Sequence, residues 1–123
     1  MTVMEVFGRG LAMLPTNVQE DAGLVRYAPQ WVNMALSEAF EAENSVRLSR
    51  GEELLEAAPV MGDPGEEIPY CERIVSYALP YFIASQAAKD DEDMHSAEDF
   101  RARYIVALRE SSRAVAVPII DNY

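Results

Sequence analysis

Glu92 and His95 are the two residues whose types and spacing could bind a metal. They form a Glu-x-x-His motif, which di-iron helical bundles use to hold their metals. Such a site needs a second copy of the motif and two further glutamates that project into the same core. His95 is the only histidine of the chain, so a second motif cannot be formed. We therefore predict that His95 is a solvated residue in the first turn of a helix and that the protein binds no metal.

The sequence contains no other arrangement typical of catalysis. Cys71 is the single cysteine and has no evident partner base, so we interpret it as a small core residue rather than a nucleophile. The chain has no glycine-rich phosphate loop, no serine nucleophile elbow and no zinc-ligand spacing. We predict that the protein is not an enzyme, with no catalytic residue and no cofactor.

Composition restricts the class of protein and its partners. A chain of 123 residues is enough for one domain, and an apolar fraction of 50% is typical of a folded globular protein. The net charge of −11 disfavours binding of duplex DNA, which needs a basic face. Residues 1–10 lack the regions of a signal peptide, and the longest apolar run, 77–84, is too short to span a bilayer. We expect a soluble, intracellular protein without membrane contact.

Hydrophobic periodicity predicts an all-α fold, a four-helix bundle-like domain over residues 1–123. The first helix covers residues 3–14 and is weakened by its two glycines. A capping box of Asn17 and Glu20 opens the second helix, which ends near residues 45–48.

The third helix covers most of residues 68–88, and the acidic turn 89–93 ends it and caps the fourth helix. On the fourth helix we predict ion pairs between Asp99 and Arg103 and between Glu98 and Arg101. The residues expected in or near one core are those that share a helical phase: Trp31, Leu36, Phe40, Ile74, Phe82, Phe100, Tyr104 and Leu108.

Two features of the apolar helices bear on assembly. Pro29 and Pro80 each stand inside an apolar pattern that continues in phase, which indicates kinks rather than breaks. Such bends could wrap the protein's own core or shape a contact between subunits. The third helix is apolar on nearly every side, so it needs neighbours on every side. In so short a chain this pattern favours an assembly.

Residues 48–67 are predicted to form an irregular loop between the second and third helices. This segment contains two prolines, three glycines and six acids, with no basic residue after Arg50. A loop of this length in a compact domain is usually functional or mobile, and both interpretations stay open. Leu54 and Leu55 are apolar enough to dock on a partner.

Residues 115–123 are predicted to form an extended tail, because Pro118 prevents a regular helix. The tail is apolar enough to need burial, either over its own bundle or on a partner. Its candidate interface residues are Val117, Ile119, Ile120 and Tyr123.

The order of several short motifs resembles the small, all-helical head–tail adaptor (connector, neck) proteins of tailed phages and prophages. The likeness covers about residue 21 to the C-terminus. It rests on these residues: Trp31-Val32-Asn33, Glu43-Asn44, Ile68-Pro69-Tyr70, Leu79-Pro80-Tyr81 followed by Ile83-Ala84, the acids at 90–93, Tyr104 and the closing Ile120-Asp121-Asn122-Tyr123.

The resemblance implies a structural protein of the virion neck, made in the host cytoplasm. Copies of such a protein form a ring, usually a dodecamer, below the portal protein and above a tail-side neck or head-completion protein. The ring extends the channel through which DNA passes without sequence-specific binding. Because the C-terminal region of this family commonly engages the portal, the tail and the loop with Leu54 and Leu55 become candidate interfaces.

A small acidic helical regulator is the alternative function. A DNA-mimicking inhibitor or an antitoxin-like partner binder would use its carboxylates as the recognition surface. Such a protein should display regularly spaced acids along one long face, whereas many acids here belong to the loop and to the turn 89–93.

Overall fold

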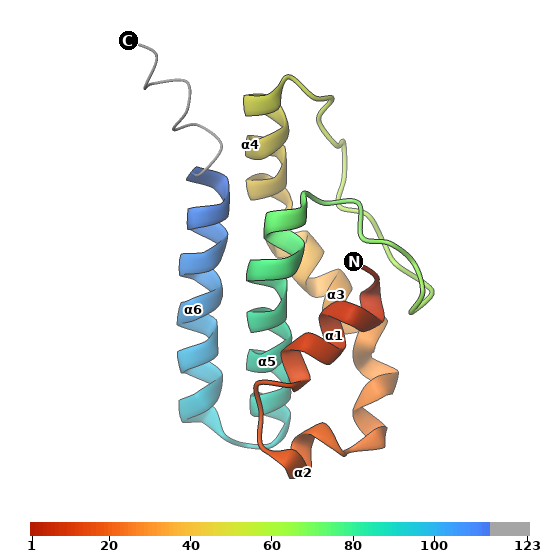
Figure 1. The fold of residues 1–123 in the computed structure, drawn as a ribbon, viewed down its shortest axis with the longest axis vertical. Coiled ribbons are helices and arrows are strands. Elements are labelled where there is room, and N and C mark those ends of the chain that lie inside the picture. The colour runs from red at the N-terminus through yellow and green to blue at the C-terminus, as the bar shows by residue number, and fades with distance from the viewer. Residues whose placement is uncertain (114–123) are drawn as a thin grey trace.

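The computed structural model describes residues 1–113, and all regular elements in that range are helical (Figure 1). The all-α prediction is confirmed. The predicted tail, with Val117, Ile119, Ile120 and Tyr123, lies outside the described residues. Six α-helical segments occur where four helices are predicted: α1 (Val3–Leu11), α2 (Thr16–Gln19), α3 (Ala28–Glu38), α4 (Phe40–Arg50), α5 (Leu79–Asp90) and α6 (Met94–Arg113). A 3₁₀ helix (Ala22–Tyr27) precedes α3, and a π-helical segment (Ile74–Ala78) precedes α5.

Helix α5 is the central element, and it packs against α6, α1 and α3 (Figure 1). Its apolar side chains, including Phe82 and Ile83, are buried by these neighbours. The expectation that this helix needs neighbours on every side is therefore met within one chain. Its apolar character therefore no longer requires an assembly, although Tyr77 and Tyr81 keep part of their rings exposed.

Helices α5 and α6 form the predicted antiparallel hairpin. Glu92 adopts a left-handed conformation (φ 60°), and the N–H of Asp93 bonds to the carbonyl of Ala88, which closes α5 with a Schellman motif. The Asp93 carboxylate then accepts the N–H of Ser96 at 3.1 Å and caps α6, as the acidic turn predicts. Hydrogen bonding from the side chain of Ser96, followed by this bond from its N–H, holds the pKa of Asp93 below its ordinary value.

Gly10 allows α1 to cross α5 at very short range. A Cβ atom at this position would lie 2.6 Å from Cβ of Ile83 and 2.8 Å from the carbonyl oxygen of Pro80. No real side chain tolerates these distances, so α1 would have to move away from α5. By contrast, a Cβ atom at Gly8 would meet nothing within 4 Å. Of the two glycines expected to weaken this helix, Gly10 is required by packing.

The helix continues through Pro80, as predicted, by means of the π-helical segment. The N–H of Leu79 bonds to the carbonyl of Ile74, one residue further back than in an α-helix. Proline cannot donate to the carbonyl four residues earlier, that of Ser76. Nη1 of Arg9 on α1 approaches this carbonyl oxygen at 3.4 Å. The carbonyl of Ser76, which Pro80 deprives of its usual donor, thus has a partner on α1.

The predicted second helix is wrong in its start and in its continuity. Pro15, not Asn17, is the N-cap residue of the short α2, and no side chain caps that end. Pro29 lies in the first turn of α3. An N–H group in that turn has no acceptor within the helix, so the proline breaks no hydrogen bond and causes no kink. At Ala39 the backbone leaves helical geometry (φ −88°, ψ 1°), which separates α3 from α4.

The predicted core is largely confirmed. Most of the predicted residues are buried in one cluster, and Phe82 and Tyr104 meet edge to face at 5.4 Å between ring centroids. Phe100 and Leu108 are half-buried against the cluster, whereas Phe40 is half-buried outside it. The eight residues predicted for the core include none from α1, whose Val3, Val6 and Phe7 are also buried there.

Candidate functional site

The loop region 51–73 is the longest segment without a named helix in the described chain. It begins at Gly51, whose left-handed conformation (φ 72°) ends α4. The prediction of an irregular loop at 48–67 is confirmed for residues 51–67, while residues 48–50 still belong to α4.

Two asparagines of α3 and α4 hold the first part of the loop. The Asn44 side chain accepts the N–H of Leu55 at 2.9 Å and donates to its carbonyl at 3.0 Å. Asn33 holds Met61 in the same way, at 2.7 Å and 2.9 Å. An amide side chain that pairs with both backbone groups of one residue replaces the pairing that a neighbouring strand would supply. The backbone of the loop is therefore fixed at two separate points, Leu55 and Met61.

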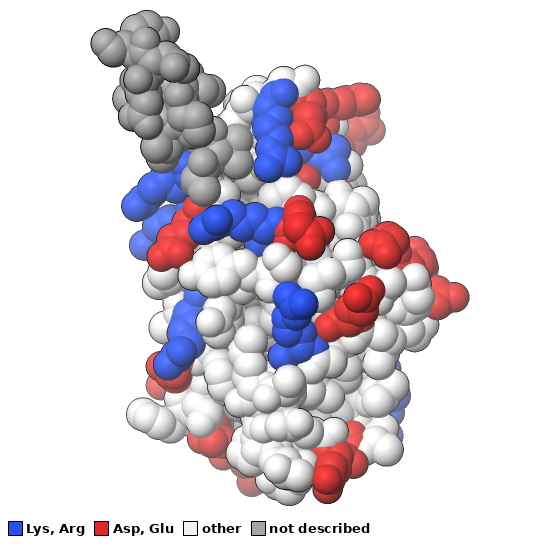
Figure 2. Space-filling view, in the orientation of Figure 1, with Lys and Arg blue, Asp and Glu red and all other residues white. Residues whose placement is uncertain are grey.

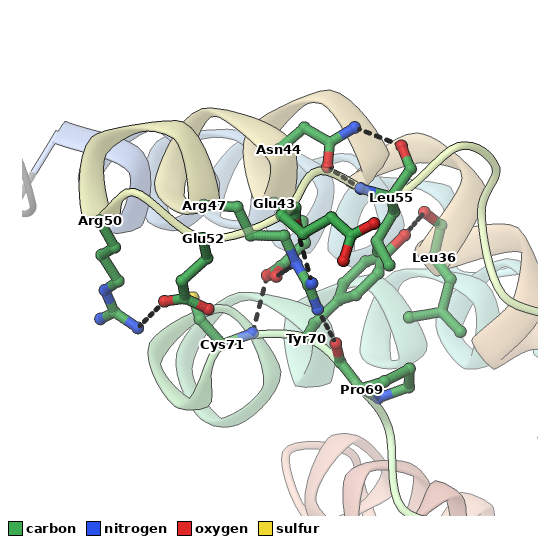
Figure 3. A network of polar contacts seen from close by, with 11 residues as sticks. Leu36, Glu43, Asn44, Arg47, Arg50, Glu52, Leu55, Pro69, Tyr70 and Cys71 are labelled. Carbon is green, nitrogen blue, oxygen red and sulfur yellow. Dashed lines mark hydrogen bonds and ion pairs between the residues drawn. The ribbon is translucent and has the colours of Figure 1, made fainter.

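A buried ion pair on α4 holds the two ends of the loop (Figure 3). Glu43 is 2% exposed, and its carboxylate accepts Nε of Arg47 at 2.6 Å and the N–H of Cys71 at 2.7 Å. The remaining guanidinium nitrogens of Arg47 donate to the carbonyls of Glu53 (3.2 Å) and Pro69 (2.9 Å). A buried carboxylate is tolerated only when it is paired and hydrogen-bonded, and Glu43 satisfies both conditions.

Tyr70 adds a further anchor at the end of the loop. Its hydroxyl donates to the carbonyl of Leu36 on α3 at 2.6 Å (Figure 3). Burial, followed by the nearby Glu43 carboxylate, raises the pKa of Tyr70 to about 12, so the hydroxyl stays a donor at neutral pH. Residues 64–68 of the loop also form backbone hydrogen bonds with the start of α1. The N–H of Val3 donates to the carbonyl of Glu66, and the N–H of Ile68 donates to the carbonyl of Met1.

The fixed loop displays a small apolar and acidic surface. Leu54 is 46% exposed and Val60 is 80% exposed, although each lies next to a residue whose backbone an asparagine holds. Two of the predicted interface residues lie in the loop. Leu54 is exposed, whereas Leu55 is half-buried against the core and helps to attach the loop to it. The acids of the loop are all exposed: Glu52, Glu53, Glu56, Asp63, Glu66 and Glu67.

A second apolar surface lies between the π-helical segment, α5 and α6. A shallow depression there is lined by Tyr77, Tyr81, Ala102, Arg103 and Val106. Tyr77 is 38% exposed and Val106 is 48% exposed. We call these five residues the α5–α6 depression.

Both basic and acidic side chains lie at this depression, where Glu110 accepts the hydroxyl of Tyr77 at 3.0 Å. The Arg73 guanidinium lies 5.6 Å from the centroid of the Tyr77 ring, and no ion pair of Arg73 occurs among the described residues. Arg103 forms the predicted pair with Asp99 at 3.1 Å, although both side chains are more than half exposed. The pair predicted between Glu98 and Arg101 is wrong, because Arg101 instead reaches Glu38 at the end of α3.

Charges are distributed unevenly between the two surfaces. On the face drawn in Figure 2, acidic side chains mark the edge formed by the loop, and most basic side chains lie over the side of α4, α5 and α6. The loop region from Gly51 to Glu67 contains only acidic charges. The loop surface is therefore flanked by acids alone, whereas the α5–α6 depression has Arg73 and Arg103 beside it together with Asp99 and Glu110.

His95, Glu92 and Cys71 are the residues that the sequence suggested for metal binding or catalysis. His95 is exposed in the first turn of α6, as predicted, and Glu92 lies in the preceding turn. Cys71 is half-buried, and burial raises the pKa of its thiol. Within residues 1–113, no group of three or more His, Cys, Asp or Glu side chains could hold a metal ion. None of the described helices is both long enough and apolar enough to cross a membrane.

The two asparagines are the main residues that sequence reasoning missed. Asn33 and Asn44 form part of the motif order quoted above, but neither periodicity nor spacing shows that they hold a loop. The capping box at Thr2 and Glu5, which starts α1, could have been found from its Thr-x-x-Glu spacing.

No family model, no curated protein and no solved structure matches the chain. The resemblance to head–tail adaptors therefore depends on the order of short motifs alone.

Proposed function

We propose that the protein is a structural head–tail connector of a tailed phage or prophage, which forms a ring below the portal and extends the DNA channel. The observation that carries this proposal is a loop anchored by hydrogen bonds, which displays apolar and acidic side chains without a covering partner in the described part of the chain. A loop held by two asparagines and a buried ion pair is built to keep a fixed shape, as a repeated contact requires. This role needs no catalytic residue, cofactor or metal.

The charge of the chain is compatible with a channel protein. At −11, a subunit contributes little attraction for phosphates, and a wall that bound phosphates tightly would slow the passage of DNA. Contacts with DNA would then be transient and independent of sequence.

The C-terminal tail and the start of the loop are suited to a common partner. Helix α6 ends at Arg113 and α4 ends at Arg50, at the same end of the bundle (Figure 1). The segment after Arg113 includes the apolar residues Val117, Ile119, Ile120 and Tyr123. We propose that this end of the bundle faces the portal, and that a tail-side neck protein binds the opposite end.

Mixing the full-length protein with its cognate portal and imaging the product tests this function. A ring of connector subunits on the portal is expected, and a variant truncated after Ala116 should dock more weakly. No association with the portal under any assembly condition would rule out the connector function. Unchanged docking of the truncated variant would remove only the role of the tail.

A further inference from the structure

We propose that neighbouring copies of this chain contact each other head to tail, with the loop residues Leu54 and Val60 of one copy docked in the α5–α6 depression of the next. This contact deepens the proposed ring and rests on it. The partner of both surfaces is thus a second copy of the same chain.

The loop is prepared for such a contact. Val60 is 80% exposed, yet the backbone of its neighbour Met61 is bonded through both its N–H and its carbonyl to Asn33. Leu54 stands in the same relation to Leu55 and Asn44. Because the backbone is already ordered, docking these side chains loses little conformational entropy.

The depression offers complementary chemistry. Tyr77 and Val106 present aromatic and aliphatic surface that residues 1–113 leave uncovered, and the partly buried Tyr81 lies beside them. Aromatic residues with adjacent arginines are typical of the well-packed centres of protein interfaces. Val60 and Leu54 are aliphatic side chains of a size that such a shallow depression can accept.

The charges favour a second copy of the chain over an unrelated apolar partner. Glu53 and Glu56 flank Leu54 on the loop. At the depression, Glu110 accepts the Tyr77 hydroxyl, whereas Arg73 has no ion pair among residues 1–113. Arg103 forms an ion pair with the exposed Asp99, and such exposed pairs contribute little, so it can pair again with a neighbour. The contact therefore sets Glu53 and Glu56 against Arg73 and Arg103, and such attraction fixes the orientation and increases the association rate.

Leu54 and Val60 do not contact the α5–α6 depression of their own molecule. The loop and α6 lie on opposite sides of α5 (Figure 1), and no loop residue lines the depression. A contact between two different surfaces of the same chain is heterologous, and its repetition closes into a ring when the rotation per subunit permits.

Chemical crosslinking of full-length chains tests the contact even when it is short-lived in solution. Single-cysteine variants are made in a Cys71→Ser background, with Val60→Cys in one chain and Val106→Cys in a size-tagged second chain. A bismaleimide with a short spacer should join positions 60 and 106 about tenfold faster than the control positions 25 and 106, because docking raises the local concentration. The control variant is Val25→Cys, since Val25 is 45% exposed on the 3₁₀ helix. Equal rates for the two pairs would overturn the proposal.

Charge reversal provides the second arm. Arg73→Glu and Arg103→Glu, added to the chain that carries Val106→Cys, should slow the reaction by about tenfold. Adding Glu53→Arg and Glu56→Arg to the chain that carries Val60→Cys should restore the rate, because the charges at the contact are again opposite. Circular dichroism of each variant checks that it is folded. A rate that does not change on the first reversal, or does not recover after the second, would contradict the proposed contact.

The outcomes separate this contact from the connector function. Crosslinked head-to-tail chains that never associate with a portal would keep the contact and remove the function. A ring on the portal in which positions 60 and 106 do not crosslink would keep the function and remove the contact.

Discussion

The α5–α6 hairpin and the loop region 51–73 are held in place by opposite kinds of interaction. The hairpin is fixed by apolar burial, with Phe82 and Tyr104 packed between the two helices. The loop region buries Met61, Ile68 and Tyr70 as well, but its backbone is fixed chiefly by polar groups: Asn33, Asn44 and the pair of Glu43 with Arg47. Burial determines where the helices lie, whereas directional hydrogen bonds determine what the loop displays.

The largest effect is expected in the hairpin. Phe82→Ala should lower the free energy of unfolding by about 3–5 kcal/mol, because the side chain is fully enclosed. Phe100→Ala, on the same hairpin but half-buried, should cost only about 1–2 kcal/mol. Denaturant titration of both variants measures the difference. Equal losses for the two would contradict the assignment of α5 as the central helix.

The crossing of α1 over α5 gives the next largest effect. Gly10→Ala should cost about 1–3 kcal/mol, because the added methyl group overlaps Ile83 and the carbonyl of Pro80. Gly8→Ala is the matched control and should increase stability by about 0.5–1 kcal/mol, because its Cβ meets open space on the same helix. Thermal unfolding of the two variants should therefore shift in opposite directions, and a stable Gly10→Ala variant would refute the close crossing.

In the loop, the expected effect is smaller and local. Asn44→Ala leaves the N–H and the carbonyl of Leu55 without their partner, at a cost of about 1–3 kcal/mol. Hydrogen exchange at the Leu55 amide should accelerate, while amides of α5 keep their protection. Asn17→Ala serves as the control, since Asn17 is exposed and forms no side-chain hydrogen bond in the described chain. Unchanged exchange at Leu55 would show that burial, rather than Asn44, holds the loop.

The smallest effect is expected at the turn of the hairpin. Glu92→Gly should increase stability by about 0.5–1 kcal/mol, because Glu92 has the left-handed conformation that glycine adopts without strain. Glu98→Gly, inside α6, should instead lower stability by about 1 kcal/mol. Chemical denaturation of both variants checks the sign, and a loss at Glu92→Gly would contradict the Schellman geometry.

The hairpin could be predicted from the sequence because burial leaves a periodic pattern. The stripe around Phe82 and Tyr104 and the cap at Asp93 are local features, read within one or two turns of a helix. The break at Ala39 and the position of Pro29 could not be read in this way, because the apolar period continues in phase across both. Periodicity reports which side is buried, but not whether the axis is continuous.

The candidate site could be predicted only in part. An acidic, irregular loop with an outward Leu54 follows from composition, but the asparagines act across 11 and 28 residues and leave no periodic signal. The choice between a mobile excursion and a fixed arm depended on these bonds. The excess of apolar residues in the predicted third helix favoured an assembly. In the structure, α1 and α3 of the same chain supply the neighbours that this helix needs.

Imaging the protein bound to its cognate portal tests the central claim most directly. We predict a closed ring in which the loop bearing Val60 lies against Tyr77 and Val106 of the adjacent subunit, with the α4 and α6 ends toward the portal. Failure of the full-length protein to associate with the portal under any assembly condition would contradict the connector function.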